Sequence, residues 1–222
     1  MKRVFISRNL KKDSIFLERL KPPGFVVDGI SLIRFELIPF EQFPSSDWIF
    51  FYSAKAVHFF FKQLNILNLK LDKEVRLAVM GKGTAKALDR MPDFIGSGVP
   101  SLVAKSFLQK ANGQRVVFPR AKHSKQSIQK LLEGRLEMLD LVVYDNQIRS
   151  IIPILEHDVL VFTSPMNVQA YFQQYKLREY QKIVSIGQTT AKALKERGIE
   201  VHVIASNASE EALADAVIEL SS

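Results

Sequence analysis

The expected fold follows from two related segments, DWIFFYSAKAV at residues 47–57 and DVLVFTSPMNV at residues 158–168. In each segment an apolar run ends at a serine, Ser53 or Ser164, and a helical pattern follows. Serine is a favoured residue at a helix N-cap, and Pro165 suits the first position of a helix. Both segments therefore predict a buried strand, a tight turn and a capped helix.

Two further matches extend this likeness into an internal repeat. RLAVMGKGTAKAL at residues 76–88 aligns with KIVSIGQTTAKAL at residues 182–194, and RVFISR at residues 3–8 aligns with RVVFPR at residues 115–120. The paired segments are offset by about 110 residues, near half of the chain, which indicates two related units rather than a solenoid.

Short apolar runs alternate with amphipathic helical patterns along the whole chain. This alternation predicts an α/β fold in which parallel sheets are covered by helices on both faces, giving three layers. The expected strands cover residues 3–7, 48–52, 76–80, 115–118, 141–144, 159–163, 183–186 and 201–204. The expected helices cover residues 13–20, 54–64, 84–89, 102–110, 125–132, 165–175, 190–197 and 210–220.

The order of the repeat favours a discontinuous domain. The opening strand lacks partners of its own until after residue 147, whereas residues 41–140 hold a full set of strands. Plain tandem halves divided near residue 112 are the alternative on composition alone. The expected division is domain 1 at residues 1–34 and 147–222, domain 2 at residues 41–140, and a two-stranded β linker at residues 35–40 and 141–146.

Composition excludes several classes of protein. The 222 residues include no cysteine, so disulfides, thiolate nucleophiles and cysteine zinc sites are ruled out, and the four histidines lie too far apart to predict a metal site. No apolar run is long enough for a membrane span or a signal peptide, so we expect a cytoplasmic protein without a membrane partner. The net charge of +8 favours anionic partners.

Each repeated motif places a helix N-terminus after a strand, and such termini attract anions. In a parallel sheet they gather at the carboxyl edge of the strands, where open α/β folds bind ligands. The GKG of residues 81–83 is neither a dinucleotide fingerprint nor a Walker A loop. Basic residues also follow the expected strands closely: Arg8, Lys55, Lys82, Arg120, Lys122, Lys125 and Arg149.

These features support two interpretations. One is an ordinary solvated basic surface above capped helices; the other is an inter-domain cleft of backbone donors, hydroxyls and cations that binds a polycarboxylate. Tyr144 ends an apolar strand of the expected linker, so its phenol is either a proton donor in that cleft or a buried structural hydroxyl. No catalytic triad or carboxylate pair accompanies it, so any catalysis must orient and polarise a substrate that is already reactive.

The chain as a whole resembles the uroporphyrinogen-III synthase family. The matching features, in order, are the strand ending at Arg8, FYSAKAV at residues 51–57, GKGTA at 81–85, the strand end VY at 143–144, FTSP at 162–165, GQTTA at 187–191 and the helix after residues 208–209. The likeness covers essentially the whole sequence. Two residues depart from the family pattern: Tyr52 stands where a threonine is usual, and Met166 where a small or hydroxyl residue is usual.

The resemblance implies two α/β domains joined by a two-stranded linker, with both chain ends in one domain. It implies a lyase that needs no cofactor and cyclises linear hydroxymethylbilane, an octacarboxylate, to uroporphyrinogen III with inversion of ring D and loss of water, in tetrapyrrole (haem) biosynthesis. It also implies a monomer and a hand-over of the bilane from hydroxymethylbilane synthase.

The resemblance further assigns site residues. Tyr144 matches the family tyrosine that assists loss of the hydroxyl, while Thr84, Ser164 and Thr190 match hydroxyl positions that face the cleft. The full set of expected substrate-binding residues is Arg8, Ser53, Lys55, Thr84, Ser164, Thr189 and Thr190.

Two other functions remain open at this point. A non-catalytic, two-lobed anion-binding protein would share the fold outline and would bind carboxylates without turnover. A nucleic-acid binder would share the basic charge, but the chain lacks helix-turn-helix, RRM and KH signatures, so we expect no nucleic-acid partner.

Overall fold

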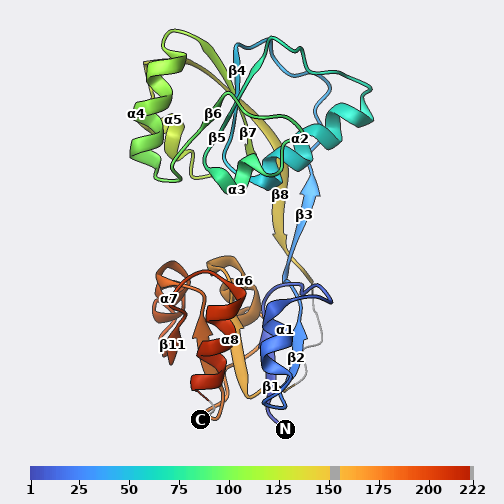
Figure 1. The fold of residues 1–222 in the computed structure, drawn as a ribbon, viewed down its shortest axis with the longest axis vertical. Helices are drawn as coiled ribbons and strands as arrows, with labels where there is room; N and C mark the ends of the chain where they lie inside the picture. Colours follow the sequence, from blue (N-terminus) through green and yellow to red (C-terminus); the bar gives the residue numbers. More distant parts are fainter. Residues whose placement is uncertain (151–155, 221–222) are drawn as a thin grey trace. The chain divides into compact units, whose positions relative to one another are not determined.

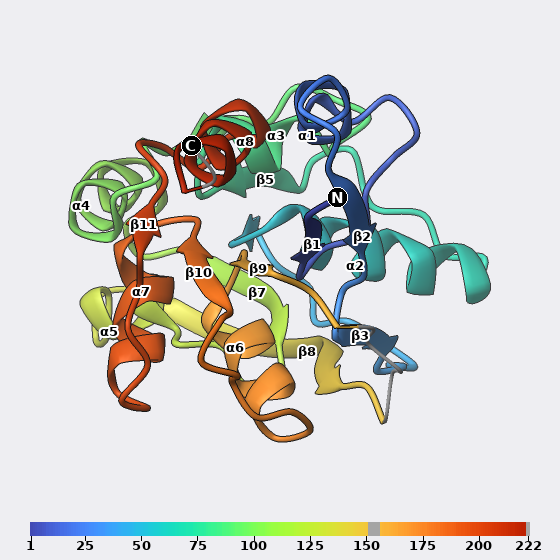
Figure 2. The same ribbon diagram turned by 90° about the horizontal axis from the view of Figure 1, so that it is seen from below.

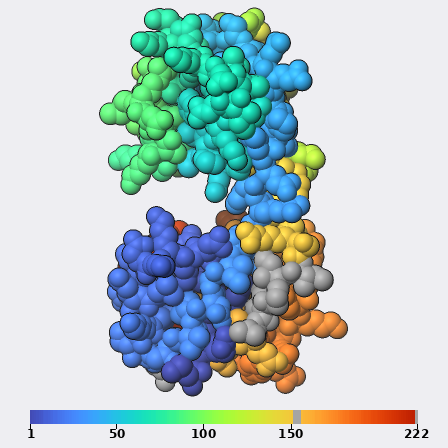
Figure 3. All heavy atoms as spheres, turned by 90° about the vertical axis from the view of Figure 1, so that its right-hand side faces the viewer, coloured from blue at the N-terminus to red at the C-terminus, as the bar shows by residue number. Residues whose placement is uncertain are grey.

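The computed structural model describes residues 1–150 and 156–220, and these form two compact units (Figure 1). Unit 1 consists of Met1–Arg34 together with Gln147–Ser222, and unit 2 consists of Phe35–Asn146. Segments from the two ends of the sequence lie side by side on the surface of unit 1 (Figure 3). The chain therefore enters unit 1, builds unit 2 and returns to unit 1.

Unit 1 contains a five-stranded sheet in the order β11-β10-β9-β1-β2, and all of its neighbouring strands are parallel. Its strands are β1 (Arg3–Ile6), β2 (Val26–Gly29), β9 (Val159–Phe162), β10 (Lys182–Ser185) and β11 (Val203–Ile204). Its helices are α1 (Ile15–Leu20), α6 (Pro165–Phe172), α7 (Gln188–Lys195) and α8 (Glu210–Glu219).

Helices cover both faces of this sheet, as Figure 2 shows. Side chains alternate between the faces of a strand, so Val4 and Ile6 pack against α1 and α8 while Phe5 packs against α6 and α7. Strand β1 is buried on both faces because it lies in the interior of the sheet.

Unit 2 contains a six-stranded sheet in the order β3-β8-β7-β4-β5-β6. Its strands are β3 (Ile33–Leu37), β4 (Trp48–Phe51), β5 (Arg76–Val79), β6 (Phe94–Ile95), β7 (Arg115–Ala121) and β8 (Glu137–Ile148), and its helices are α2 (Ala54–Ile66), α3 (Lys82–Ala85), α4 (Pro100–Ala111) and α5 (Ser127–Leu131). The pairs from β8 through β6 are parallel. β3 runs antiparallel to β8, since Ile38 N donates to Val143 O at 3.0 Å and Arg149 N donates to Leu32 O at 2.9 Å.

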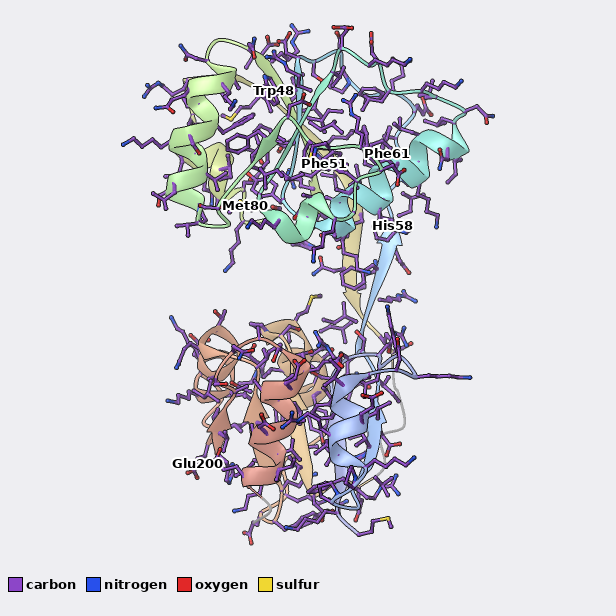
Figure 4. The ribbon with its side chains drawn as sticks, viewed as in Figure 1. Trp48, Phe51, His58, Phe61, Met80 and Glu200 are labelled. Atoms are coloured by element: carbon purple, nitrogen blue, oxygen red, sulfur yellow. The ribbon has the colours of Figure 1, made fainter. Side chains whose placement is uncertain are left out.

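Aromatic side chains fill both halves of the core of unit 2. Phe51 packs with Phe60 of α2 on one face of the sheet, and Phe50 packs with Phe107 of α4 on the other. Figure 4 shows Trp48 and Phe51 at opposite ends of β4. The strand is thus buried on both faces, as its continuous apolar sequence predicts.

The two sheets have equivalent strand orders, which explains the sequence repeat. The order β2-β1-β9-β10-β11 of unit 1 corresponds to β8-β7-β4-β5-β6 of unit 2, so β9 matches β4, β10 matches β5 and β1 matches β7. These are the three pairs of segments that align in sequence. The predicted α/β fold of two related parallel-sheet units is confirmed, and the tandem division near residue 112 is wrong because β1 pairs with β9.

Some elements differ from the sequence expectation. β2 and β6 were not predicted, because β2 is only half-buried and β6 has two residues, too few for a pattern. β8 is much longer than the expected strand at 141–144. Residues 35–37 and 141–146 of the expected linker belong to β3 and β8 in the sheet of unit 2.

The helices α3 and α7 begin earlier than expected. Gly81 and Gly187 occupy their N-caps, so each helix starts at the residue after the glycine rather than at a threonine. The N–H groups of Thr84 and Thr190 are already bonded to the carbonyl oxygens of these glycines, at 3.0 and 3.1 Å.

The turn that leads into α3 packs closely against the segment after β6. A Cβ atom at Gly96 would lie 2.5 Å from the carbonyl oxygen of Met80 and 2.6 Å from Val103 Cγ2. Figure 4 shows Met80 beside α3. Only a glycine allows the backbone after β5 to approach this segment so closely.

We therefore expect Gly96→Ala to lower the free energy of unfolding by about 1–3 kcal/mol, as overpacking does elsewhere. Gly83→Ala is the matched control, because a Cβ there meets nothing within 4 Å and alanine favours a helix. Urea unfolding followed by circular dichroism measures both variants. Equal stability of the two would contradict the close approach.

A charged cluster lies at the amino edge of the sheet of unit 1. The Asp28 carboxylate accepts a hydrogen bond from Arg3 Nη2 at 2.7 Å and lies 2.7 Å from Nε2 of the buried His157. Burial alone would raise the pKa of Asp28, but the hydrogen bonds from His157 and Arg3 outweigh it and hold the pKa below the ordinary value of 3.8.

The folded state lowers the pKa of Asp28, so the charged carboxylate stabilises unit 1 at pH values above the ordinary pKa of 3.8. This stabilisation is lost as the pH falls through the lowered pKa. Asp28→Asn should therefore destabilise the protein at neutral pH and approach wild type in acid. Urea midpoints measured at several pH values check this, with the exposed Asp13→Asn as control. A stability deficit of Asp28→Asn that is constant with pH would rule out this linkage.

Candidate functional site

The helix caps at the carboxyl edges of both sheets follow the sequence pattern. Ser53 caps α2 and its Oγ accepts a hydrogen bond from Ala56 N at 3.2 Å, while Ser164 caps α6 and its Oγ accepts from Asn167 N at 3.2 Å. The capped termini place hydroxyl groups and unpaired backbone N–H groups at one edge of each sheet. Such an edge can bind anions.

Tyr144 lies beside one of these caps in unit 2. Its hydroxyl is 3.5 Å from Ser53 Oγ, a long contact in which either group could be the donor. The ring stacks on Phe59 of α2, with centroids 5.2 Å apart and planes inclined by 17°, and only 8% of the residue is exposed. The core therefore holds the ring, and the hydroxyl points toward the serine.

A β-bulge directs Tyr144 to this position. Arg120 pairs with Val142, but the next residue of β7, Ala121, pairs with Tyr144, so β8 carries one extra residue. Both Val143 and Tyr144 then pack into the core on the α2 face, although successive residues of a regular strand face opposite sides. Without the bulge, Tyr144 would point away from Ser53.

Lys55 joins the same group of residues through Phe35. Its ammonium nitrogen lies over the ring of Phe35, 4.6 Å from the centroid, and this ring is 6.1 Å from that of Tyr144. The structure thus brings together Tyr144, Ser53 and Lys55, which sequence reasoning selected. It adds Phe35 and Phe59, for which the sequence offered no signal beyond an aromatic residue in an expected strand or helix.

Thr84 lies on the next strand connection along the same edge of unit 2. Its side chain is largely buried, with 8% of the residue exposed, because α3 packs this face against the sheet. Thr190, its counterpart in unit 1, is 2% exposed, whereas the neighbouring Thr189 is exposed. Of the two hydroxyls in the GQTTA segment, that of Thr189 is the one that solvent reaches.

The remaining selected residues lie at the carboxyl edge of unit 1. Ser164 Oγ accepts a second hydrogen bond, from Asn167 Nδ2 at 2.9 Å. Both acceptor positions of the oxygen are then used, and the hydroxyl can still donate its proton. Asn167 Oδ1 in turn accepts from Leu32 N at 2.9 Å. Arg8 follows β1, and its guanidinium lies 3.8 Å from the carboxylate of Glu210.

Arg120, the counterpart of Arg8 in the repeat, is fully engaged in unit 2. It donates to both oxygens of Asp140, at 3.0 and 2.6 Å, and this pairing lowers the pKa of Asp140. Gln129 Nε2 donates to the same carboxylate at 2.5 Å. The charge of Arg120 is therefore neutralised by the protein itself.

Tyr52, at a position where the family resemblance leads us to expect a threonine, forms hydrogen bonds with Gln129. Its hydroxyl accepts from Gln129 N and donates to Gln129 Oε1, both at 3.2 Å. Burial raises the pKa of this phenol to about 12, so it stays protonated at neutral pH. The hydroxyl of Tyr52 thus fixes α5, while the cap at Ser53 is intact.

Residues 1–150 and 156–220 contain neither a cluster of metal-ligating side chains nor a membrane-spanning helix. Within these residues no three histidine, aspartate or glutamate side chains gather as a metal site would require. No helix in the same part of the chain has the length and apolar character needed to cross a membrane.

Comparisons with known proteins agree with the fold. A uroporphyrinogen-III synthase of Chlorobaculum parvum is 27% identical over 237 aligned positions, covering 92% of this chain and 93% of that protein. The crystal structure of uroporphyrinogen-III synthetase from Helicobacter pylori matches with a TM-score of 0.74 at 22% identity, over 99% of this chain and 100% of that one. A mutant uroporphyrinogen III synthase from Thermus thermophilus matches with a TM-score of 0.62 at 18% identity, over 100% and 98%.

The family model described as uroporphyrinogen-III synthase HemD matches residues 16–215, which include every selected site residue except Arg8. This match spans both units and the strands that join them. The chain belongs to the uroporphyrinogen-III synthase family.

Proposed function

We propose that this chain is a uroporphyrinogen-III synthase, which cyclises linear hydroxymethylbilane to uroporphyrinogen III in tetrapyrrole (haem) biosynthesis. The observation that carries the proposal is the contact of Tyr144 with the Ser53 cap, in a chain that matches the family over residues 16–215. The reaction expels water, so the enzyme is a lyase, and the proposal invokes no cofactor.

The first step is loss of the terminal hydroxyl of the bilane. Tyr144 donates its phenol proton to this hydroxyl as the C–O bond breaks, water leaves with the bonding electron pair, and an azafulvene cation remains on the first pyrrole ring. The substituted carbon of ring D then attacks the cation and forms a spiro intermediate. The bond from that carbon to the methylene bridge of ring C then breaks and leaves an azafulvene cation on ring C. Ring D, now inverted, attacks this cation through its free α-carbon and closes the macrocycle, and the proton lost from that carbon restores the phenol.

Positioning decides which isomer forms. The cation cyclises without an enzyme to the symmetric isomer I, so the protein must hold the bilane with the substituted carbon of ring D nearest the cation. The eight carboxylates of the substrate suit a protein of net charge +8 whose helix caps offer hydroxyls and N–H groups. We assign carboxylate binding to Arg8, Ser53, Lys55, Ser164 and Thr189. To Thr84 and Thr190, of which only 8% and 2% is exposed, we assign the packing that holds the N-termini of α3 and α7 at the carboxyl edges of their sheets.

The proposal includes the organisation of the enzyme. Residues 1–34 and 147–222 form one domain, residues 41–140 form the other, and residues 35–40 and 141–146 connect them. The enzyme is a cytoplasmic monomer and receives the unstable bilane from hydroxymethylbilane synthase.

The direct test is to supply freshly generated hydroxymethylbilane, oxidise the products and separate the porphyrin isomers by chromatography. We expect isomer III to dominate, because the enzyme orients ring D before closure. The control without protein should give isomer I. A product mixture that is the same with and without protein would refute the proposed function.

Tyr144→Phe should lower kcat by about tenfold to a hundredfold, the range for one general acid, and leave isomer III as the main product. The cation can still form without the phenol, only more slowly. Tyr180→Phe is the control, because Tyr180 is exposed in unit 1 and belongs to no part of the site. Complete loss of activity in folded Tyr144→Phe would show that positioning alone does not account for catalysis.

A further inference from the structure

Phe35 is an exposed aromatic side chain beside the site, on β3. The exposed fraction of Phe35 is 39%, which is unusual for a large apolar side chain next to a buried core. Its ring is tilted by 55° to that of Tyr144 at a centroid distance of 6.1 Å. Tyr144 already packs on Phe59 within the core, so burial of Tyr144 does not require Phe35.

The exposed ring of Phe35 binds the ammonium group of Lys55. The distance of 4.6 Å from nitrogen to ring centroid lies within the range of a cation–π interaction. No carboxylate pairs with Lys55 among residues 1–150 and 156–220. Because a free lysine side chain samples many rotamers, the ring of Phe35 is the contact that fixes where this charge lies.

The type of contact matters for an anionic substrate. A carboxylate partner would neutralise the cation, as Asp140 neutralises Arg120 at 2.6 Å. An aromatic ring holds an ammonium group through its quadrupole and leaves the net positive charge intact. Lys55 is thereby both placed and available to a carboxylate.

We propose that Phe35 is a positioning residue of this site: its ring holds the Lys55 ammonium group next to Tyr144, ready to bind a carboxylate on the pyrrole ring that loses the hydroxyl. This inference rests on the proposed function for the identity of the substrate. Phe35 acts through Lys55 and takes no part in proton transfer.

Kinetics with hydroxymethylbilane test the proposal. Phe35→Leu should raise KM about two- to fivefold, the loss expected for one exposed cation–π contact, with kcat little changed. Phe35→Trp should restore KM, because tryptophan binds cations at least as well. Phe43→Leu is the matched control: Phe43 is a partly buried phenylalanine of unit 2 that packs on Phe60. A rise in KM that Phe35→Trp does not rescue would overturn the proposal.

A double-mutant cycle separates positioning from packing. If Phe35 acts through Lys55, adding Phe35→Leu to Lys55→Met should raise KM no further than Lys55→Met alone. If the two substitutions instead raise KM by factors that multiply in the double variant, the proposal is overturned.

A measurement without substrate keeps this inference separate from the proposed function. In NMR spectra of the full chain, the ε-methylene protons of Lys55 should be shifted upfield by the ring of Phe35, and Phe35→Leu should remove the shift. An unshifted Lys55 in the wild-type protein would overturn the inference. Failure to make isomer III while this shift is present would refute the proposed function instead.

Discussion

The whole arrangement depends on the parallel pairing of β1 with β9, which joins residues at opposite ends of the sequence. Val4 pairs with Val159, and β1 lies inside the sheet of unit 1 with both faces buried. A strand so apolar must be covered on both faces, and its partners on one side come only from the second half of the chain. Unit 1 is therefore discontinuous, and the chain has to leave it and return through β3 and β8.

The same parallel order determines where chemistry can occur. Every strand-to-helix connection opens at the carboxyl edge of its sheet, so the caps at Ser53 and Ser164 recur at equivalent places in the two units. What distinguishes unit 2 is the bulge opposite Ala121, which turns Tyr144 toward Ser53. The residue inserted in β8 thus brings the hydroxyl of Tyr144, our proposed proton donor, beside the serine cap of unit 2.

Sequence patterns predicted much of this fold because continuous apolar strands and serine caps are local signals. The three alignments of the sequence repeat also matched the strands that are equivalent in the two sheets: β1 with β7, β9 with β4, and β10 with β5. The bulge could not be predicted, since its only trace is the adjacent pair Val143 and Tyr144 in place of strict alternation. The contact of Lys55 with Phe35 could not be predicted from the sequence either, because tertiary packing brings the start of a helix against a strand twenty residues earlier.

The interrupted path of unit 1 has a consequence for biosynthesis on the ribosome. Unit 2 is one contiguous segment, residues 35–146, and it is the first unit whose strands and helices have all been synthesised. Unit 2 can therefore fold during translation. β1 and β2, although made earlier, must wait for β9, β10 and β11 before their sheet is complete. A premature stop codon after residue 146 would therefore yield a folded unit 2 that carries an unpaired, apolar N-terminal segment, a ready target for chaperones and proteases.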